Sequence, residues 1–458
     1  MSWVDRVAAR FRRKAPRRPE ARPFAFDSQS RMDVASFAAR SRGADQIDLP
    51  RFQSTAGDQI DSKHLDPTAA ARLRLRDAFT PSQPVSDRRM FAGRRESLAQ
   101  LIRAIEDQRV HAVVHGERGI GKTSTLNILS QAAREARYLV IYVSCGEGST
   151  FDEVFRVVAA QIPLLFHRDY GPTHPETERG GVFADLLPAS PVSTRRAGDI
   201  LARVTGTRVL AILDEFDRAE SHQFRSAIGE LMKDLSDRSV RVQLVISGVA
   251  ANLTELLEYI PSIQRNVFAL ELPKMTESEV RQMIKKGEGA SGLAYPDEVI
   301  RLLISYAAGF PYLASLLGHH AGLAAVDAGR SFVSRADVGA AADQALLELK
   351  SRISRRSQLQ IADTVHHGGL GALGALARAA QSSTGRFTVN EVGMASADGE
   401  EQAKRQLLET LVNEGVLIEG AEDEFGRRYR FIEESVPLYL SLLASRSRSL
   451  ETPAMAQA

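Results

Sequence analysis

Cysteine is almost absent from this chain of 458 residues, which contains Cys145 alone. A single cysteine cannot form an intramolecular disulfide, so a disulfide-stapled scaffold is excluded and a reducing interior is favoured. An excess of one charge is absent as well, because 59 basic residues balance 57 acidic residues to a formal net charge of +2. The composition therefore gives no global argument for binding nucleic acid or an acidic surface, and any such patch must be local.

A secretory signal is also missing from the first residues, because arginines interrupt every short apolar run there. We therefore expect a cytoplasmic protein. Leu302–Val326 has no Asp, Glu, Lys or Arg and is long enough to span a bilayer, but it contains Gly309, Pro311 and two histidines. We interpret this segment as two buried helices joined by a turn.

Composition shifts divide the chain into five parts. We expect a basic, mostly disordered arm at 1–85, an α/β core at 86–272, a helical lid at 273–347, a winged helix at 348–450 and a tail at 451–458. Eight Arg or Lys residues lie between Met1 and Arg22. Two interpretations of this basic stretch are open: an anchor for an anionic membrane surface or nucleic acid, and a solvated tail.

Short apolar runs alternate with helical segments in the core. This alternation predicts a parallel sheet covered by helices on both faces, which is an α/β fold. The segment His167–Thr194 is rich in proline and glycine and is expected to be a long loop. The expected strands are Val110–Val114, Tyr138–Val143, Val209–Leu213, Val242–Ile246 and Val267–Leu272.

The strands stop after Leu272. A helix capped by Thr276 or Glu277 is expected to open the lid. The last part predicts helices around Leu370–Ala380, near Thr388 and over Glu400–Asn413, followed by a hairpin of Val416–Ile418 and Tyr429–Phe431. Three helices followed by a two-stranded wing describe a winged helix.

A phosphate-binding pattern follows the first expected strand. The sequence VVHGERGIGKTSTL matches G-x-x-x-x-G-K-[ST] between a strand and a helix, which is the context that the chemistry requires. Backbone N–H groups at a helix N-terminus favour anions, and glycines let phosphates approach closely. Lys122 is expected to reach the β- and γ-phosphates of ATP, and Thr123 to hold Mg²⁺. The expected nucleotide-binding residues are Gly116, Glu117, Arg118, Gly119, Ile120, Gly121, Lys122, Thr123 and Ser124.

An acidic strand end supplies the second half of the predicted site. Asp214 is expected to be the other protein ligand of the metal, and Glu215 to polarise the attacking water. A third strand, VQLVISG, ends in Ser247. Two roles are open for this serine: contact with the γ-phosphate or the lytic water, and capping of the turn before a helix over 252–258.

These motifs resemble the AAA-plus ATPases, in particular the branch of replication-initiator (origin-recognition and Cdc-type) and STAND signalling ATPases. The resemblance rests on MFAGRRESLAQLI before the P-loop, DEFD at the strand end, AAGFPYLASLLG in the lid and the winged helix. It implies that Phe91 lies beside the adenine and that Arg265 is an arginine finger acting across a subunit boundary in a homo-oligomer. A solvated surface arginine is the alternative for Arg265.

The lid departs from the initiator pattern. Its helix begins Gly309-Phe310-Pro311 and contains no arginine, whereas initiator-type members place a sensing arginine there. The G-x-P pattern resembles STAND members and implies a slow, nucleotide-gated switch in which Pro311 contacts the nucleotide.

Charges in the winged helix leave the partner open. The expected recognition helix carries more acids than bases, which disfavours DNA, whereas Arg427, Arg428 and Arg430 in the wing favour phosphate. We therefore expect an ATP-driven switch acting on a protein partner. Its alternatives are an initiator-like DNA-binding ATPase and a non-hydrolysing scaffold tethered to an anionic membrane through the arm.

Overall fold

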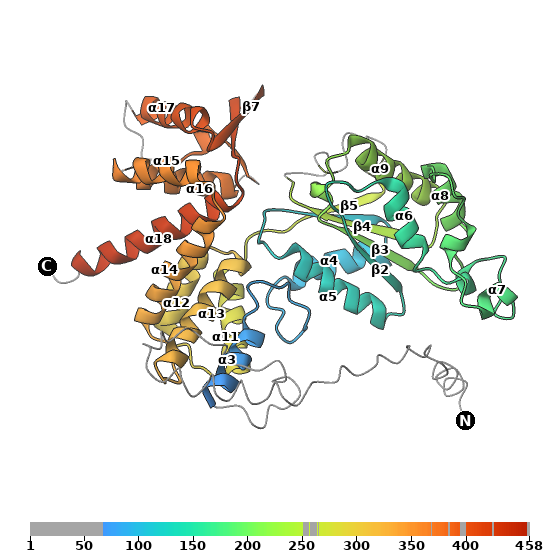
Figure 1. Ribbon diagram of the computed structural model, residues 1–458, viewed down its shortest axis with the longest axis horizontal. Coiled ribbons are helices and arrows are strands. Elements are labelled where there is room, and N and C mark those ends of the chain that lie inside the picture. Colours follow the sequence, from blue (N-terminus) through green and yellow to red (C-terminus); the bar gives the residue numbers. More distant parts are fainter. Residues whose placement is uncertain are drawn as a thin grey trace, which may run out of the picture. The chain divides into compact units, whose positions relative to one another are not determined.

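The computed structural model in Figure 1 describes residues 67–250, 256, 263, 265–367, 369–382, 385–393, 400–423 and 426–455. The basic stretch Met1–Arg22 lies outside the described residues, and so do most of the helix expected over 252–258 and the end of the tail. In the part of the chain that the structure describes, no helix is both long and apolar enough to cross a membrane.

The core is built on a five-stranded sheet whose neighbouring strands all run parallel. The spatial order is β2-β3-β4-β1-β5, so the chain crosses the sheet between β1 and β2 and returns from β4 to the far side of β1. This confirms the α/β fold class and all five expected strands. The strands are β1 (His111–His115), β2 (Leu139–Ser144), β3 (Val209–Asp214), β4 (Val242–Gly248) and β5 (Val267–Glu271).

The central strands carry apolar side chains on both faces because both faces are covered. In β3, Leu210 and Ile212 belong to one buried cluster, whereas Ala211 and Leu213 belong to the other. Figure 1 shows α4 and α5 on one side of the sheet and α6, α8 and α9 on the other. The core helices are α4 (Arg95–Glu106), α5 (Lys122–Glu135), α6 (Phe151–Ala159), α7 (Pro175–Glu178), α8 (Thr194–Leu201) and α9 (His222–Asp237).

The segment expected as a long loop at 167–194 has structure of its own. It contains α7 and the 3₁₀ turn η3 (Phe183–Leu186), and the Phe183 side chain is fully buried in the core cluster. His167 forms an isolated antiparallel bridge with Val204. The prolines and glycines therefore mark tight turns in a packed segment rather than an unstructured insertion.

The lid consists of four helices after β5. Thr276 caps the first of them, and Glu279 completes a capping box, as the sequence predicts. The charge-free segment forms two helices, because Ala308 and Gly309 adopt positive φ and break the chain between them. The helices are α11 (Glu277–Ser291), α12 (Asp297–Ala307), α13 (Pro311–Asp327) and α14 (Arg335–Ser351).

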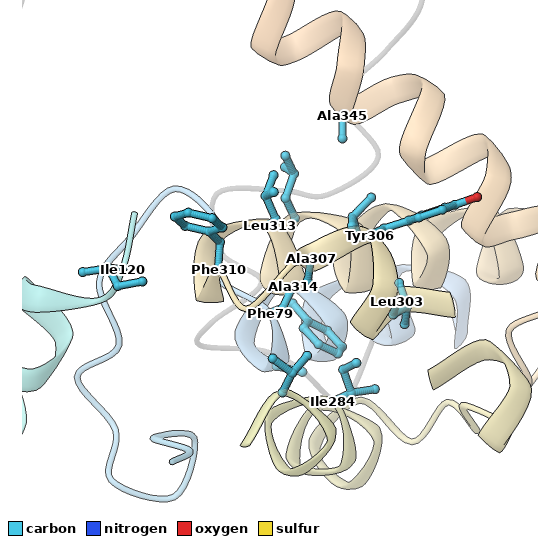
Figure 2. Packing of buried hydrophobic residues seen from close by; sticks show 14 of the residues in the cluster. Phe79, Ile120, Ile284, Leu303, Tyr306, Ala307, Phe310, Leu313, Ala314 and Ala345 are labelled. Atoms are coloured by element: carbon cyan, nitrogen blue, oxygen red, sulfur yellow. The ribbon is translucent and has the colours of Figure 1, made fainter. Parts of the chain in front are cut away.

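A fifth helix joins the lid from the segment that the sequence placed in the disordered arm. Helix α3 (Pro67–Ala78) packs against α11 and α13. Phe79 and Leu75 are buried in the cluster that contains the lid residues, and Figure 2 shows Phe79 beneath Ala307 and Ala314. A Cβ atom at Gly287 or at Gly318 would lie within 2.6 Å of the Phe79 ring, so these glycines make room for it. The expected disorder of residues 67–85 is therefore wrong, because their apolar side chains complete a core formed by distant helices.

The last part has the element order of a winged helix with an added strand. The expected helix near Thr388 is wrong: the chain forms a short strand there, followed by the 3₁₀ turn η6 (Val389–Glu391). The hairpin of β7 and β8 is confirmed, and β6 extends it to three strands in the order β6-β8-β7. The elements are α15 (Arg355–His366), α16 (Leu370–Ser382), β6 (Arg386–Thr388), α17 (Glu400–Asn413), β7 (Leu417–Asp423), β8 (Gly426–Phe431) and α18 (Ser435–Met455).

Candidate functional site

The loop between β1 and α5 has the backbone that a phosphate cradle needs. Gly116, Gly119 and Gly121 all have positive φ, at 142°, 76° and 97°. Other residues adopt these conformations only under strain, which explains the glycines of the pattern. Gly121 is the N-cap of α5, so the unpaired N–H groups of the first helical turn open onto the loop.

Lys122 lies on the inner side of this loop. Its Nζ donates to the carbonyl oxygens of Gly116 and Glu117, each at 2.9 Å. Burial lowers the pKa of the lysine to about 8, and the carboxylates of Asp217 and Asp214 oppose that shift. An arriving phosphate anion would favour the charged ammonium in the same way.

The predicted metal ligands meet at the carboxyl end of the sheet. Thr123 Oγ1 donates to Asp214 Oδ2 at 2.8 Å, although the two residues are 91 positions apart. Tyr142, on the neighbouring strand β2, donates its hydroxyl to the same oxygen at 2.5 Å. Burial and the hydrogen bond to Asp214 both raise the pKa of Tyr142, so this hydroxyl stays protonated and remains a donor.

These donors fit a magnesium ion. A hydroxyl and a buried carboxylate are hard oxygen ligands, and Mg²⁺ usually takes only one or two of its ligands from protein. Among the described residues, no cluster of three or more His, Cys, Asp or Glu side chains could hold a metal. Thr123 and Asp214 would therefore hold Mg²⁺ together with phosphate oxygens and water.

Glu215 follows Asp214 in a left-handed conformation, with φ of 54°. Such a conformation is uncommon for a residue with a side chain. The carboxylate accepts hydrogen bonds from Ser144 Oγ at 3.1 Å and from Arg218 Nη1 at 2.9 Å. The side chain of Glu215 is 47% exposed, so solvent reaches the predicted water-activating group.

The lid touches the phosphate loop directly. Ile120 belongs to the same buried cluster as Phe310 of the lid, and Figure 2 shows it on the loop that faces Phe310. The Tyr312 N–H donates to the Gly119 carbonyl oxygen at 3.4 Å, and Pro311 lies 3.6 Å from the position of a Cβ at Gly121. The G-x-P start of α13 is therefore packed on the glycines of the loop.

Arg94 supports the same loop from the other side. It is 4% exposed, and its Nη2 donates to the Ile120 carbonyl oxygen at 3.1 Å. Its backbone N–H donates to Glu279 Oε1 of the lid at 2.8 Å. Arg94, which belongs to the segment MFAGRRESLAQLI, thus connects the loop to helix α11.

The acidic residue of the loop, Glu117, has a raised pKa. Burial raises its pKa to about 7, and nearby Glu271 raises it further, whereas Lys274 and Lys122 lower it. Asp217 is also affected, because burial raises the pKa of its carboxyl. Negative charge is therefore costly in this part of the site unless a cation accompanies it.

A cavity of about 610 Å³ opens beside the loop. Its walls come from five places: the phosphate loop with the acidic strand end, the end of β4, the segment Thr80–Val85, the lid, and the first turn of α18. Val85 is held at its edge because its N–H donates to Ser124 Oγ at 3.0 Å. From α18 and the residue before it, Glu434, Ser435 and Leu438 reach the cavity, and Glu434 forms an ion pair with Arg118 of the loop.

The remaining predicted residues lie in three different settings. Ser247 is fully buried at the end of β4, and its Oγ has no hydrogen-bond partner among the described atoms. Arg265 is exposed in the turn before β5. Phe91 is not among the described residues that line the cavity, and its carbonyl oxygen accepts a hydrogen bond from Lys286 Nζ at 2.6 Å. The roles expected for all three stay predictions.

Sequence reasoning missed several residues of this site. Asp217 was visible as the last letter of DEFD, and Tyr142 as a polar side chain in an apolar strand. Arg352 and Glu434 also line the cavity, and they gave no signal because they lie at element boundaries far from the loop in sequence. Cys145, which directly follows β2, is 2% exposed, and burial raises the pKa of its thiol to about 12.

A family comparison agrees with this geometry. Residues 105–257 match the family described as AAA domain. This range includes β1, the phosphate loop and the acidic end of β3, so the family match covers both halves of the candidate site. No curated protein matches the chain in sequence.

Three of the solved structures that match the chain are the following. Cdc6p from Pyrobaculum aerophilum is 16% identical with a TM-score of 0.45, and the match covers 82% of this chain and 98% of that one. The Orc1 protein of Aeropyrum pernix in complex with DNA is 15% identical with a TM-score of 0.43, over 82% and 98%. The Walker-type ATPase of Pyrococcus abyssi is 15% identical with a TM-score of 0.46, over 78% and 98%.

Proposed function

We propose that this chain, which contains an AAA-type P-loop ATPase domain, is a nucleotide-dependent switch that controls a protein partner or an assembly. The observation that supports the switch is the shared cavity. The phosphate loop, Pro311 of the lid and Glu434 beside α18 all line it, so a bound nucleotide would contact three parts of the chain at once. A ligand shifts a conformational equilibrium when it contacts one state better than the other, and this cavity provides such contacts.

Binding follows from the loop chemistry. Backbone N–H groups at the start of α5 would receive the phosphates of ATP, and Lys122 would exchange its bonds to loop carbonyl oxygens for phosphate oxygens. Thr123 and Asp214 would hold Mg²⁺, which neutralises charge on the phosphates when it is bound. Tyr142 keeps the Asp214 carboxylate in place during this exchange.

Hydrolysis is assigned to Glu215. Its side chain lines the cavity, and its carboxylate would orient and polarise the attacking water. The hydrogen bonds from Arg218 and Ser144 both occupy Oε2 of this carboxylate. Since α13 contains no arginine to complete the site, we expect turnover to be slow.

Turnover of ATP by Glu215→Gln tests the enzymatic part. The variant is expected to bind ATP as tightly as the wild type and to lose hydrolysis by about 100-fold or more. Glu220→Gln is the matched control, because Glu220 is an exposed acid that does not line the cavity. Equal background turnover in the wild type and in Glu215→Gln would leave a binding protein and remove the ATPase.

Amide hydrogen exchange tests the switching part. ATP with Mg²⁺ is expected to change the exchange of residues 432–440, which lead into and begin α18, as well as that of the phosphate loop. If exchange changes in the phosphate loop alone, the switch is contradicted, because α18 would then line the cavity without responding to the nucleotide.

A second candidate function is DNA binding, which the wing arginines favour. Arg386 lies opposite Arg430 in the antiparallel pairing of β6 and β8, and Arg428 follows the same face of β8. Tyr429 and Phe431, which alternate with Arg428 and Arg430 along β8, belong to the buried cluster on the opposite face. The arginines therefore gather on one face of the sheet, where a phosphate backbone would be attracted. Duplex affinity that does not change with salt, or with replacement of Arg428 and Arg430, would remove this candidate.

Two further expectations concern partners. Arg265 is exposed and therefore accessible to a second subunit, as a finger in a homo-oligomer requires. The membrane tether of the third hypothesis depends on Met1–Arg22, which lies outside the described residues. Liposome binding that survives deletion of residues 1–22 would exclude that tether.

A further inference from the structure

The charged side chains that line the nucleotide cavity differ in whether they already form an ion pair. Among the described residues, four basic side chains line it, and four acidic side chains do so as well. ATP would add about four negative charges to this balanced set. The basic side chains are Arg118, Lys122, Arg218 and Arg352, and the acidic ones are Asp214, Glu215, Asp217 and Glu434.

Three of the four basic side chains are already held. Arg118 pairs with Glu434, and Arg218 pairs with Glu215 at 2.9 Å. Lys122 donates to two carbonyl oxygens of its own loop. Arg352 is the remaining basic side chain, and no carboxylate in the described part of the chain forms an ion pair with it.

Tyr312 connects the Arg352 side chain to the phosphate loop. The guanidinium carbon of Arg352 lies 5.5 Å from the centroid of the Tyr312 ring. The Tyr312 N–H in turn bonds to the carbonyl oxygen of Gly119 in the loop. The charge of Arg352 also acts on the Tyr312 hydroxyl, since it opposes the rise in the tyrosine pKa that burial causes. A guanidinium has five N–H donors, so others remain for phosphate oxygens, which suit its planar fork.

Arg352 also occupies a junction in the chain. It is the C-cap of α14, and α15 begins three residues later behind its N-cap, Ser354. Glu433 accepts hydrogen bonds from the Ser354 backbone N–H at 2.6 Å and from its Oγ at 2.8 Å. Because Glu433 adjoins Glu434, the junction and the cavity wall of α18 are connected within a few residues.

We propose that Arg352 binds the phosphate chain of the nucleotide and thereby links nucleotide binding to the junction between lid and winged helix. The inference rests on the proposed function and assigns a contact within that same site. The lid then supplies a phosphate-binding cation from the end of α14, although α13 carries no arginine. On nucleotide binding the guanidinium exchanges its contact with the Tyr312 ring for phosphate oxygens, and the α14–α15 connection moves with it.

Equilibrium binding of ATP in the presence of Mg²⁺ tests the assignment. Arg352→Gln keeps a long polar side chain but removes the charge, and it is expected to weaken ATP binding by about 10- to 100-fold. Arg352→Lys keeps the charge without the fork and is expected to restore part of the affinity. The affinity of the wild type for ATP should also fall more steeply with added NaCl than the ATP affinity of Arg352→Gln does.

Lys350→Gln is the matched control, because it removes one positive charge from the exposed face of the same last turn of α14. It is expected to bind ATP like the wild type. Thermal unfolding without nucleotide checks that the variants fold alike. Wild-type protein that fails to bind ATP would overturn the proposed function itself. Wild-type binding with equal affinity in Arg352→Gln would overturn only the role of Arg352, and so would an equal loss in Lys350→Gln.

Discussion

At the scale of single residues, the acidic end of β3 depends on how its oxygen atoms are shared. Asp214 Oδ2 accepts bonds from Thr123 and Tyr142, and Oδ1 accepts the backbone N–H of Glu215 at 2.9 Å. A carboxylate held at both oxygens keeps one orientation when a ligand is exchanged. Tyr142 is the partner that a metal would not displace, because it is not itself a predicted metal ligand.

Tyr142→Phe is therefore expected to weaken metal binding more than nucleotide binding. Loss of a hydrogen bond to a metal ligand typically costs about 10- to 100-fold in metal affinity. Mn²⁺ affinity of the ATP complex, measured by electron paramagnetic resonance, would report this loss, whereas ATP affinity in EDTA should change little. Tyr138→Phe is the control. Among the described polar atoms, the Tyr138 hydroxyl contacts only Arg208, at 3.5 Å, and Arg208 does not line the cavity. Unchanged Mn²⁺ affinity in Tyr142→Phe would show that Asp214 needs no such support.

The site was predictable at this scale where chemistry is local. The glycines of the loop, Lys122 and Asp214 follow from a pattern whose spacing has a backbone reason. Tyr142 and Arg94 act through contacts with residues dozens of positions away, and no spacing in the sequence encodes such contacts. The sequence therefore predicts the groups that meet a nucleotide better than the groups that orient them.

At the scale of elements, the buried strands were predictable because parallel strands covered on both faces must be apolar throughout. Helix α3 was missed for the opposite reason. Its sequence PTAAARLRLRDA mixes arginines with apolar residues, and its buried face becomes apparent only against α11 and α13. The helix expected near Thr388 is replaced by β6 and the 3₁₀ turn η6, where Thr388 and Glu391 form a capping box that could equally begin an α-helix.

Removal of the Phe79 side chain tests whether α3 is part of the lid. Phe79 is 1% exposed and lies between α11 and α13, so Phe79→Ala is expected to destabilise the fold by about 3 kcal/mol or more. Urea unfolding followed by circular dichroism measures this change. Phe332→Ala is the control, because Phe332 is 48% exposed and should cost far less. Equal effects of the two substitutions would place α3 outside the cooperative core.

At the scale of the whole molecule, the cavity brings together residues that the sequence separates widely. Arg118 and Glu434 are 316 positions apart, yet they form an ion pair at the edge of the phosphate loop. The end of the hairpin and the start of α18 carry no motif that predicts this contact. The proposed function therefore depends on contacts between residues that are distant in sequence, and replacement of the charged Glu434 tests this dependence most directly.

Glu434→Gln is expected to bind ATP about two- to fivefold more tightly than the wild type. The carboxylate both repels phosphates and occupies Arg118, but its side chain is 44% exposed, so solvent screens the effect and keeps it modest. Glu298→Gln is the matched control on the exposed surface of α12. Binding is measured by titration calorimetry, together with hydrogen exchange of the first turn of α18.

The double variant Arg118→Gln with Glu434→Gln separates the two causes. If Glu434 acts by occupying Arg118, its substitution should no longer tighten binding once Arg118 is replaced, and the two effects will not add. If it acts by repelling phosphate, the gain should persist in the double variant. In both cases the ATP-dependent change in exchange of α18 should shrink, because the charge that distinguishes the two states is gone. A full-sized change in Glu434→Gln would mean that the nucleotide moves α18 through the lid, where Arg352 leads to Ser354 and Glu433.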